Sequence, residues 1–67
     1  MNKEYLTREI SNIKMFIKTL ENSKARIYEL VELGNVDGNE KADLFIIDSM
    51  VDGFKSGIVE LTKLLNE

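Results

Sequence analysis

The stretch Gly-Asn-Val-Asp-Gly-Asn, residues 34–39, divides this chain of 67 residues into two halves of similar length. Gly34 stands where a glycine commonly ends a helix, because a residue without a Cβ adopts the left-handed conformation at no steric cost. Asp37 is followed three residues later by Glu40, which has the form of a capping box that starts a helix. Asn39 is an alternative N-cap residue. The stretch therefore predicts a turn between two helices.

Apolar residues repeat with helical spacing on both sides of this turn. Before it, steps of three and four residues, with one gap at Lys24, connect Leu6, Ile10, Ile13, Ile17, Leu20, Ile27 and Val31. After it, the same steps connect Leu44, Ile47, Val51, Phe54, Ile58, Leu61 and Leu65 without a gap. This spacing is typical of amphipathic helices that pack along a narrow seam.

We therefore predict an all-α chain that forms a single helical domain over residues 1–67. Its helices span residues 3–33 and 39–65, joined by a turn at 34–38. At 1.5 Å per residue both helices are roughly 40–45 Å long, so they match as the arms of an antiparallel hairpin.

Residues 21–26 leave one alternative open, because they contain a single apolar residue. Asn22 or Ser23 could cap a new helix there. The first helix would then split near residues 21–26, and the chain would form a monomeric three-helix bundle. Since this segment has neither proline nor glycine, the continuous helix is favoured.

Both arms are apolar over more than the seam. Phe16 and Leu30 widen the apolar stripe of the first helix, and Met50 and Leu64 widen the second on the equivalent flank. Two helices cover one stripe each, so the flanking residues stay exposed in a lone hairpin. We expect the hairpin to form a homodimer, an antiparallel four-helix bundle; a different partner could cover the same stripe.

The composition argues against catalysis. The chain has no cysteine and no histidine, so thiolate zinc sites, disulfides and histidine-based catalysis are excluded. Asp48 and Asp52, with Lys55 nearby, are interpreted as a solvated face with a weak ion pair. We expect no enzyme activity, no metal site and no cofactor.

Charge and hydropathy indicate a cytoplasmic protein. The net charge is -3, the first residues are charged where a secretory signal would be apolar, and no apolar run is long enough to cross a membrane. Seven lysines against two arginines, with seven isoleucines and two alanines, suggest an AT-rich gene of the kind found in low-GC bacteria, their phages and plasmids.

The second helix carries the candidate partner-binding residues. Ser49, Gly53 and Gly57 form a track of small residues, and Phe45 and Ile46 are apolar residues off the seam. The carboxylates of this helix, which include Asp43, Asp48, Asp52 and Glu60, would steer it toward a basic partner. We expect a non-enzymatic protein-interaction module that acts as an adaptor, inhibitor or regulator of a larger protein partner. A purely structural assembly subunit is an alternative.

A further alternative rests on a resemblance in the first helix. Asn12 and Phe16 reproduce an Asn-x-x-x-Phe spacing, and Lys3 lies near the start of the chain. With its length, hairpin layout and implied dimer, the chain resembles the Rop family of plasmid RNA-binding regulators. The resemblance implies a four-helix dimer that grips paired RNA loops with its first helices. The next positions on this track, Leu20 and Ile27, are apolar where the family pattern is polar or basic.

Overall fold

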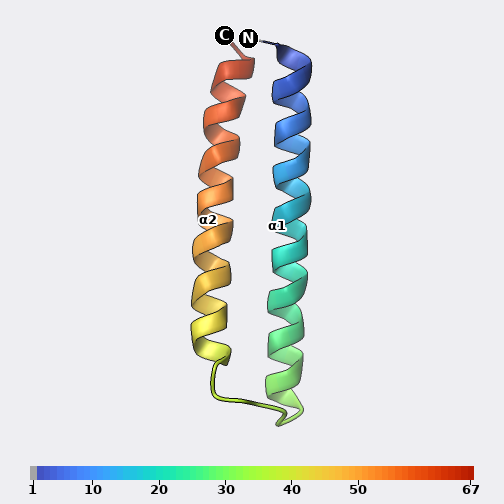
Figure 1. Ribbon diagram of the computed structural model, residues 1–67, viewed down its shortest axis with the longest axis vertical. Coiled ribbons are helices and arrows are strands. Elements are labelled where there is room, and N and C mark those ends of the chain that lie inside the picture. Colours follow the sequence, from blue (N-terminus) through green and yellow to red (C-terminus); the bar gives the residue numbers. More distant parts are fainter. Residues whose placement is uncertain (1) are drawn as a thin grey trace.

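The computed structural model describes residues 2–67 and shows two long helices side by side (Figure 1). Helix α1 spans Lys3–Glu32 and helix α2 spans Glu40–Leu65. The helices are antiparallel, so both ends of the chain lie at one end of the hairpin and the connecting loop lies at the other (Figure 1). The prediction of an all-α antiparallel helical hairpin is confirmed.

Helix α1 runs without a break through residues 21–26. The Ser23 hydroxyl donates a hydrogen bond of 3.1 Å to the backbone carbonyl of Thr19, one turn earlier, instead of capping a new helix. The alternative of a split first helix, and with it the three-helix bundle, is therefore wrong. Serine in mid-helix is tolerated here because its hydroxyl is satisfied within the helix.

Side-chain and backbone hydrogen bonds satisfy the free groups at both ends of α1. At the start, Asn2 Oδ1 accepts from the backbone N–H of Glu4 at 2.8 Å. At the end, Gly34 has a φ of +74°. Its N–H donates to the carbonyl of Val31 at 3.0 Å, and the N–H of Asn35 donates to the carbonyl of Leu30 at 2.9 Å. This pair of bonds is a Schellman motif, which glycine favours in the left-handed position.

The start of α2 combines parts of the two capping patterns that the sequence offers. The Glu40 carboxylate accepts from the backbone N–H groups of Asp37 and Gly38, as the glutamate of a capping box does. Asp37 Oδ1 accepts from the N–H of Asn39 at 2.9 Å, two residues on, which is an Asx turn. Asn39 occupies the N-cap position, but its side chain makes no capping bond.

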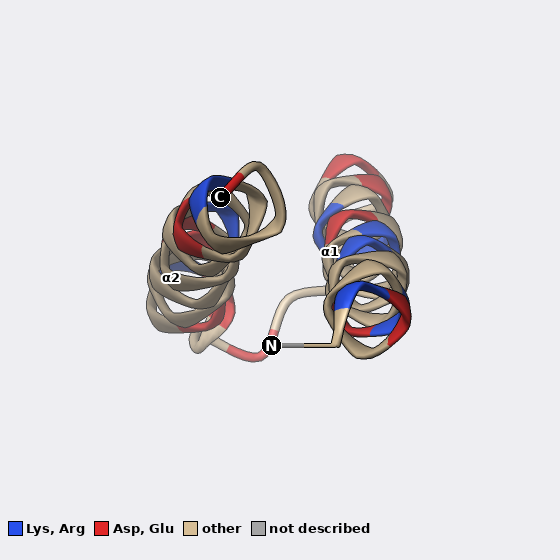
Figure 2. Cartoon of the chain, turned by 90° about the horizontal axis from the view of Figure 1, so that it is seen from above, with Lys and Arg blue, Asp and Glu red and all other residues tan. Residues whose placement is uncertain are grey.

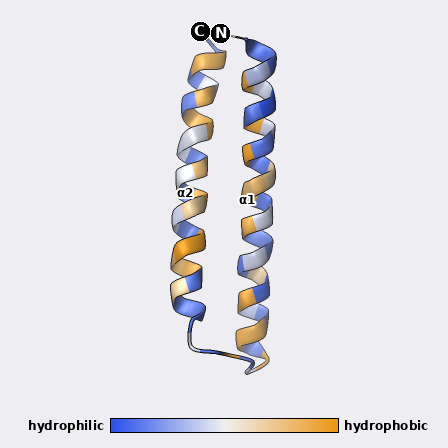
Figure 3. Ribbon diagram, in the orientation of Figure 1, coloured by the Kyte–Doolittle hydropathy of each residue, from blue (hydrophilic) through white to orange (hydrophobic). Residues whose placement is uncertain are grey.

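The core lies along the seam between the helices and is thin. Of the described residues, Leu6 and Val51 are buried, at 1% and 7% exposed. The other apolar seam residues are partly exposed, and Val31 near the loop is exposed. Hydropathy colouring shows apolar residues on the side of α1 that faces α2, and a larger apolar share on α2 (Figure 3). Between residues 2 and 67, neither helix has an apolar stretch long enough to cross a membrane.

Candidate interaction surface

The antiparallel arrangement gives the hairpin two broad sides of opposite chemistry. In an antiparallel pair, the same flank of the heptad lies on the same side of both helices. One flank, which we call the apolar side, is formed by Glu9, Phe16, Ser23 and Leu30 of α1 and by Asp43, Met50, Gly57 and Leu64 of α2. The opposite flank, which we call the polar side, is formed by Thr7, Lys14, Glu21, Tyr28, Lys41, Asp48, Lys55 and Thr62.

Two observations confirm that the helices meet in this way. A shallow hollow of about 230 Å³ is lined by residues of both helices on the apolar side, namely Phe16, Thr19, Leu20, Met50 and Phe54. The rings of Phe16 and Phe54 pack there with centroids 5.9 Å apart. On the other side of the seam, Lys24 Nζ lies 2.7 Å from Asp48 Oδ1 across the two helices.

The apolar side exposes four large hydrophobic side chains. The side chains of Phe16 and Met50 are 54% and 45% exposed, and those of Leu30 and Leu64 are 37% exposed. Gly57 lies among them, and a Cβ added to it would meet no atom within 4 Å. Nothing in the chain itself therefore requires a glycine at this position.

The five candidate partner-contact residues do not form one cluster. At 100° per residue, Ile46, Gly53 and Gly57 lie along the edge of the apolar side, whereas Phe45 and Ser49 lie on the face of α2 that points away from α1. Phe45 is 73% exposed, and Ser49 donates its hydroxyl to the Phe45 carbonyl at 2.9 Å. Phe45 therefore stands on a surface of its own.

Some of the carboxylates of α2 form ion pairs within the chain. Asp48 holds Lys24, and this hydrogen bond raises the pKa of the Lys24 ammonium group above its ordinary value. Glu60 pairs with Lys63 at 3.4 Å. Two of the four carboxylates expected to steer a basic partner are thus already matched within the chain, which leaves Asp43 and Asp52. Seen from above, basic and acidic residues are distributed over both helices (Figure 2).

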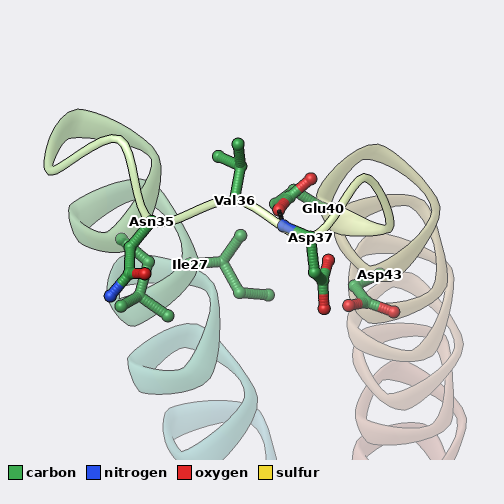
Figure 4. A pocket seen from close by; sticks show the side chains of 7 residues that line it. Ile27, Asn35, Val36, Asp37, Glu40 and Asp43 are labelled. Atoms are coloured by element: carbon green, nitrogen blue, oxygen red, sulfur yellow. Dashed lines mark hydrogen bonds between the residues drawn. The ribbon is translucent and has the colours of Figure 1, made fainter.

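A second hollow of about 180 Å³ lies at the loop end, where Ile27 points toward the start of α2 (Figure 4). Its lining includes the carboxylates of Asp37, Glu40 and Asp43. Because two of these carboxylates bind backbone N–H groups, the hollow is a product of turn chemistry. No group of three or more acidic side chains in the part of the chain that the structure describes is arranged to hold a metal ion.

The residues that suggested RNA binding are only partly brought together. Lys3 and Asn12 line a shallow hollow on α1 together with Glu4, Thr7, Arg8 and Ser11. Phe16 does not line this hollow, since its ring packs against Phe54 on the apolar side. Phe16 therefore lies apart from the hollow that Lys3 and Asn12 line.

The contact between Lys24 and Asp48 does not follow from the residue pattern of either helix alone. Lys24 occupies the gap in the apolar seam of α1, and Asp48 was interpreted with Asp52 and Lys55 of its own helix. Both residues lie 12 positions from Val36 in the middle of the loop. Because residues equally far from the loop lie at the same height in a hairpin, this spacing is the signal that indicates the pair.

Comparison with known proteins places the chain in no family: no protein-family model matches it, and no curated protein or solved structure is significantly similar to it.

Proposed function

We propose that this chain is a non-enzymatic protein-interaction module that acts as an adaptor, inhibitor or regulator of a larger protein partner. One observation carries the proposal: among residues 2–67 two apolar side chains are buried, whereas thirteen large hydrophobic side chains are exposed. Exposed hydrophobic side chains that lie close together on a surface are typical of protein-binding sites.

The contact to the larger partner centres on Phe45. This side chain is the most exposed large hydrophobic residue within either helix, at 73%. Asp52, two turns further along α2, lies on the same outward face and makes no ion pair with any residue from 2 to 67. The matching partner surface has an apolar pocket for an aromatic ring with a basic side chain at its rim.

Site-specific photocrosslinking tests this proposal. A photoreactive phenylalanine analogue replaces Phe45 in one variant and Lys14, on the polar side of α1, in a control variant. In lysate of the native host, we expect one defined adduct from position 45 and none from position 14. Excess unlabelled wild-type chain should compete for the adduct, whereas excess Phe45→Glu variant should not.

Equal labelling from both positions, or competition by the Phe45→Glu variant, would show that Phe45 is not the contact. An adduct that weakens as salt rises would further indicate a basic rim, because screening reduces the attraction between Asp52 and a cation. An adduct whose yield is independent of salt would contradict the basic rim and leave the apolar contact.

A further inference from the structure

We propose that the apolar side of the hairpin is covered by a second copy of the same chain, in a two-fold dimer with the loops at opposite ends. This inference is independent of the proposed function, because Phe45 points away from this side. The broad face of the hairpin measures 49 by 15 Å, roughly 700 Å². A standard protein interface uses about 600–1,000 Å² from each partner, and a face of this size falls within that range.

The apolar side is complementary to itself. Residues of α1 and α2 that are about equally far from the loop form four pairs on this side. From the open end to the loop, these pairs are Leu64 with Glu9, Phe16 with Gly57, Met50 with Ser23, and Leu30 with Asp43. Every pair combines one large apolar residue with a residue that is small or polar. A two-fold axis across the middle of the hairpin brings Met50 onto Gly57 of the second copy and Phe16 onto Ser23. Large residues then fill the space above small ones, as packed helical layers do.

This arrangement explains why position 57 is a glycine. An interior glycine destabilises a helix by roughly 0.5–1 kcal/mol relative to alanine, so a glycine that nothing crowds is unfavourable in the lone hairpin. In the dimer, the thioether of Met50 from the second copy occupies the space where a side chain at position 57 would project. Close approach of two α2 helices requires this space.

Charge selects the orientation of the two copies. The loop end, residues 26–43, carries five acidic and two basic side chains. Loops at the same end would place two such acidic ends within one Debye length, about 8 Å, where they repel each other. Loops at opposite ends keep them apart by most of the 49 Å length of the hairpin. A second copy would also add to the core, since two buried side chains make a core too small for a domain without disulfides.

Sedimentation equilibrium on the full chain tests the dimer. We expect a dimer at micromolar concentration, and we expect Met50→Glu and Gly57→Leu each to raise the dissociation constant of the dimer about 30-fold or more. Matched controls are Thr62→Glu on the polar side and Ser56→Leu on the outward face, which should leave the dimer intact. Phe45→Glu should also leave it intact, so loss of partner binding and loss of the dimer are distinguishable.

Single spin labels test the orientation, since the chain has no cysteine of its own. A label at Asn35→Cys in the loop should give an inter-label distance on the order of the hairpin length of 49 Å. A distance below roughly 20 Å, about twice the spacing of packed helices, would overturn the arrangement. A wild-type chain that sediments as a monomer, or a dimer that Met50→Glu and Gly57→Leu leave unchanged, would overturn the inference. If these variants unfold, the spin-label distance in the wild-type background still decides.

Discussion

The two broad sides of the hairpin are built from equivalent positions of the two helices, but they differ in how well water solvates their exposed side chains. Tyr28 on the polar side and Phe16 on the apolar side are exposed to nearly the same extent, at 52% and 54%. Most neighbours of Tyr28 on its side are charged residues and threonines, whereas Phe16 lies with Met50 and Phe54. Water solvates the first side well and the second poorly.

The sides also differ in what holds the helices together. Toward the polar side, Lys24 of the seam forms an ion pair with Asp48, which joins two defined positions because a hydrogen bond this short exists at one register. On the apolar side, Phe16 and Phe54 contribute packing that tolerates small shifts. The polar side therefore contributes to alignment, and the apolar side supplies attraction.

The largest expected loss of stability comes from a substitution in the seam between the helices, which holds both sides of the hairpin together. Val51→Asp places a carboxylate at a position that is 7% exposed. Burying an unpaired charge costs several kcal/mol, about as much as the whole stability of a domain of this size. We expect loss of most helical signal in circular dichroism at 25 °C. Asp52→Asn, one residue away on the outward face, is the control and should remain folded. A helical Val51→Asp variant would contradict the assignment of the core.

The next prediction compares the loss of stability on truncating one aromatic side chain on each side. We expect Phe16→Ala to destabilise the protein by about 2 kcal/mol. Truncation of a fully buried phenylalanine costs about 3–5 kcal/mol, and the cost is smaller for one that is half-exposed. Tyr28→Ala should cost less than about 1 kcal/mol. Urea denaturation at two protein concentrations measures both losses. The cost of Phe16→Ala should depend on protein concentration if a second copy covers it. Equal costs at both positions would remove the distinction between the sides.

A smaller effect is expected from charge reversal on the polar side. Asp48→Lys places two ammonium groups together across the helices and should lower the Tm by less than Phe16→Ala does, since exposed ion pairs contribute little. The double variant with Lys24→Asp restores opposite charges and should recover most of the loss. Asp52→Lys is the control for net charge. If it lowers the Tm as much as Asp48→Lys does, repulsion across the seam is not the cause.

The smallest effect is a pH dependence of the same pair. Asp48 raises the pKa of Lys24 in the folded state, so the folded chain holds this proton more tightly than the unfolded chain. The stabilisation is fully present below the unfolded pKa of about 10.4 and is lost as pH rises through the folded pKa. The Tm difference between wild type and Lys24→Gln should therefore be constant at neutral pH and shrink above about pH 10.4. A difference that already shrinks near neutral pH would contradict this assignment.

Much of the fold follows from local rules that can be applied without coordinates. The steps of three and four between apolar residues predict both helices, and Gly34 marks the end of the first within one residue. The continuity of α1 through residues 21–26 does not follow from apolar spacing alone. Weak apolar periodicity there signals a break, but Ser23 satisfies its hydroxyl within the helix and no residue in the segment opposes helix formation.

The candidate sites could be predicted only in part. Periodicity identifies Phe16, Leu30, Met50 and Leu64 as flanking residues, because one helix is enough to define a flank. The predicted partner-contact residues include Phe45 together with Gly53 and Gly57, although helix geometry places Phe45 on the outward face of α2 and the two glycines nearer the apolar side. A one-dimensional track of residues does not say which part of a helix the neighbouring helix covers.

The sequence by itself determined two amphipathic helices and the turn between them, because helix spacing and end-capping act over a few residues. The tertiary structure decided which flanks share a side and which charges meet. Lys24 shows the difference: within its helix it is a gap in an apolar seam, and across the hairpin it is the partner of Asp48 at 2.7 Å. Contacts between the arms depend on their register, which exists only once the two helices pack.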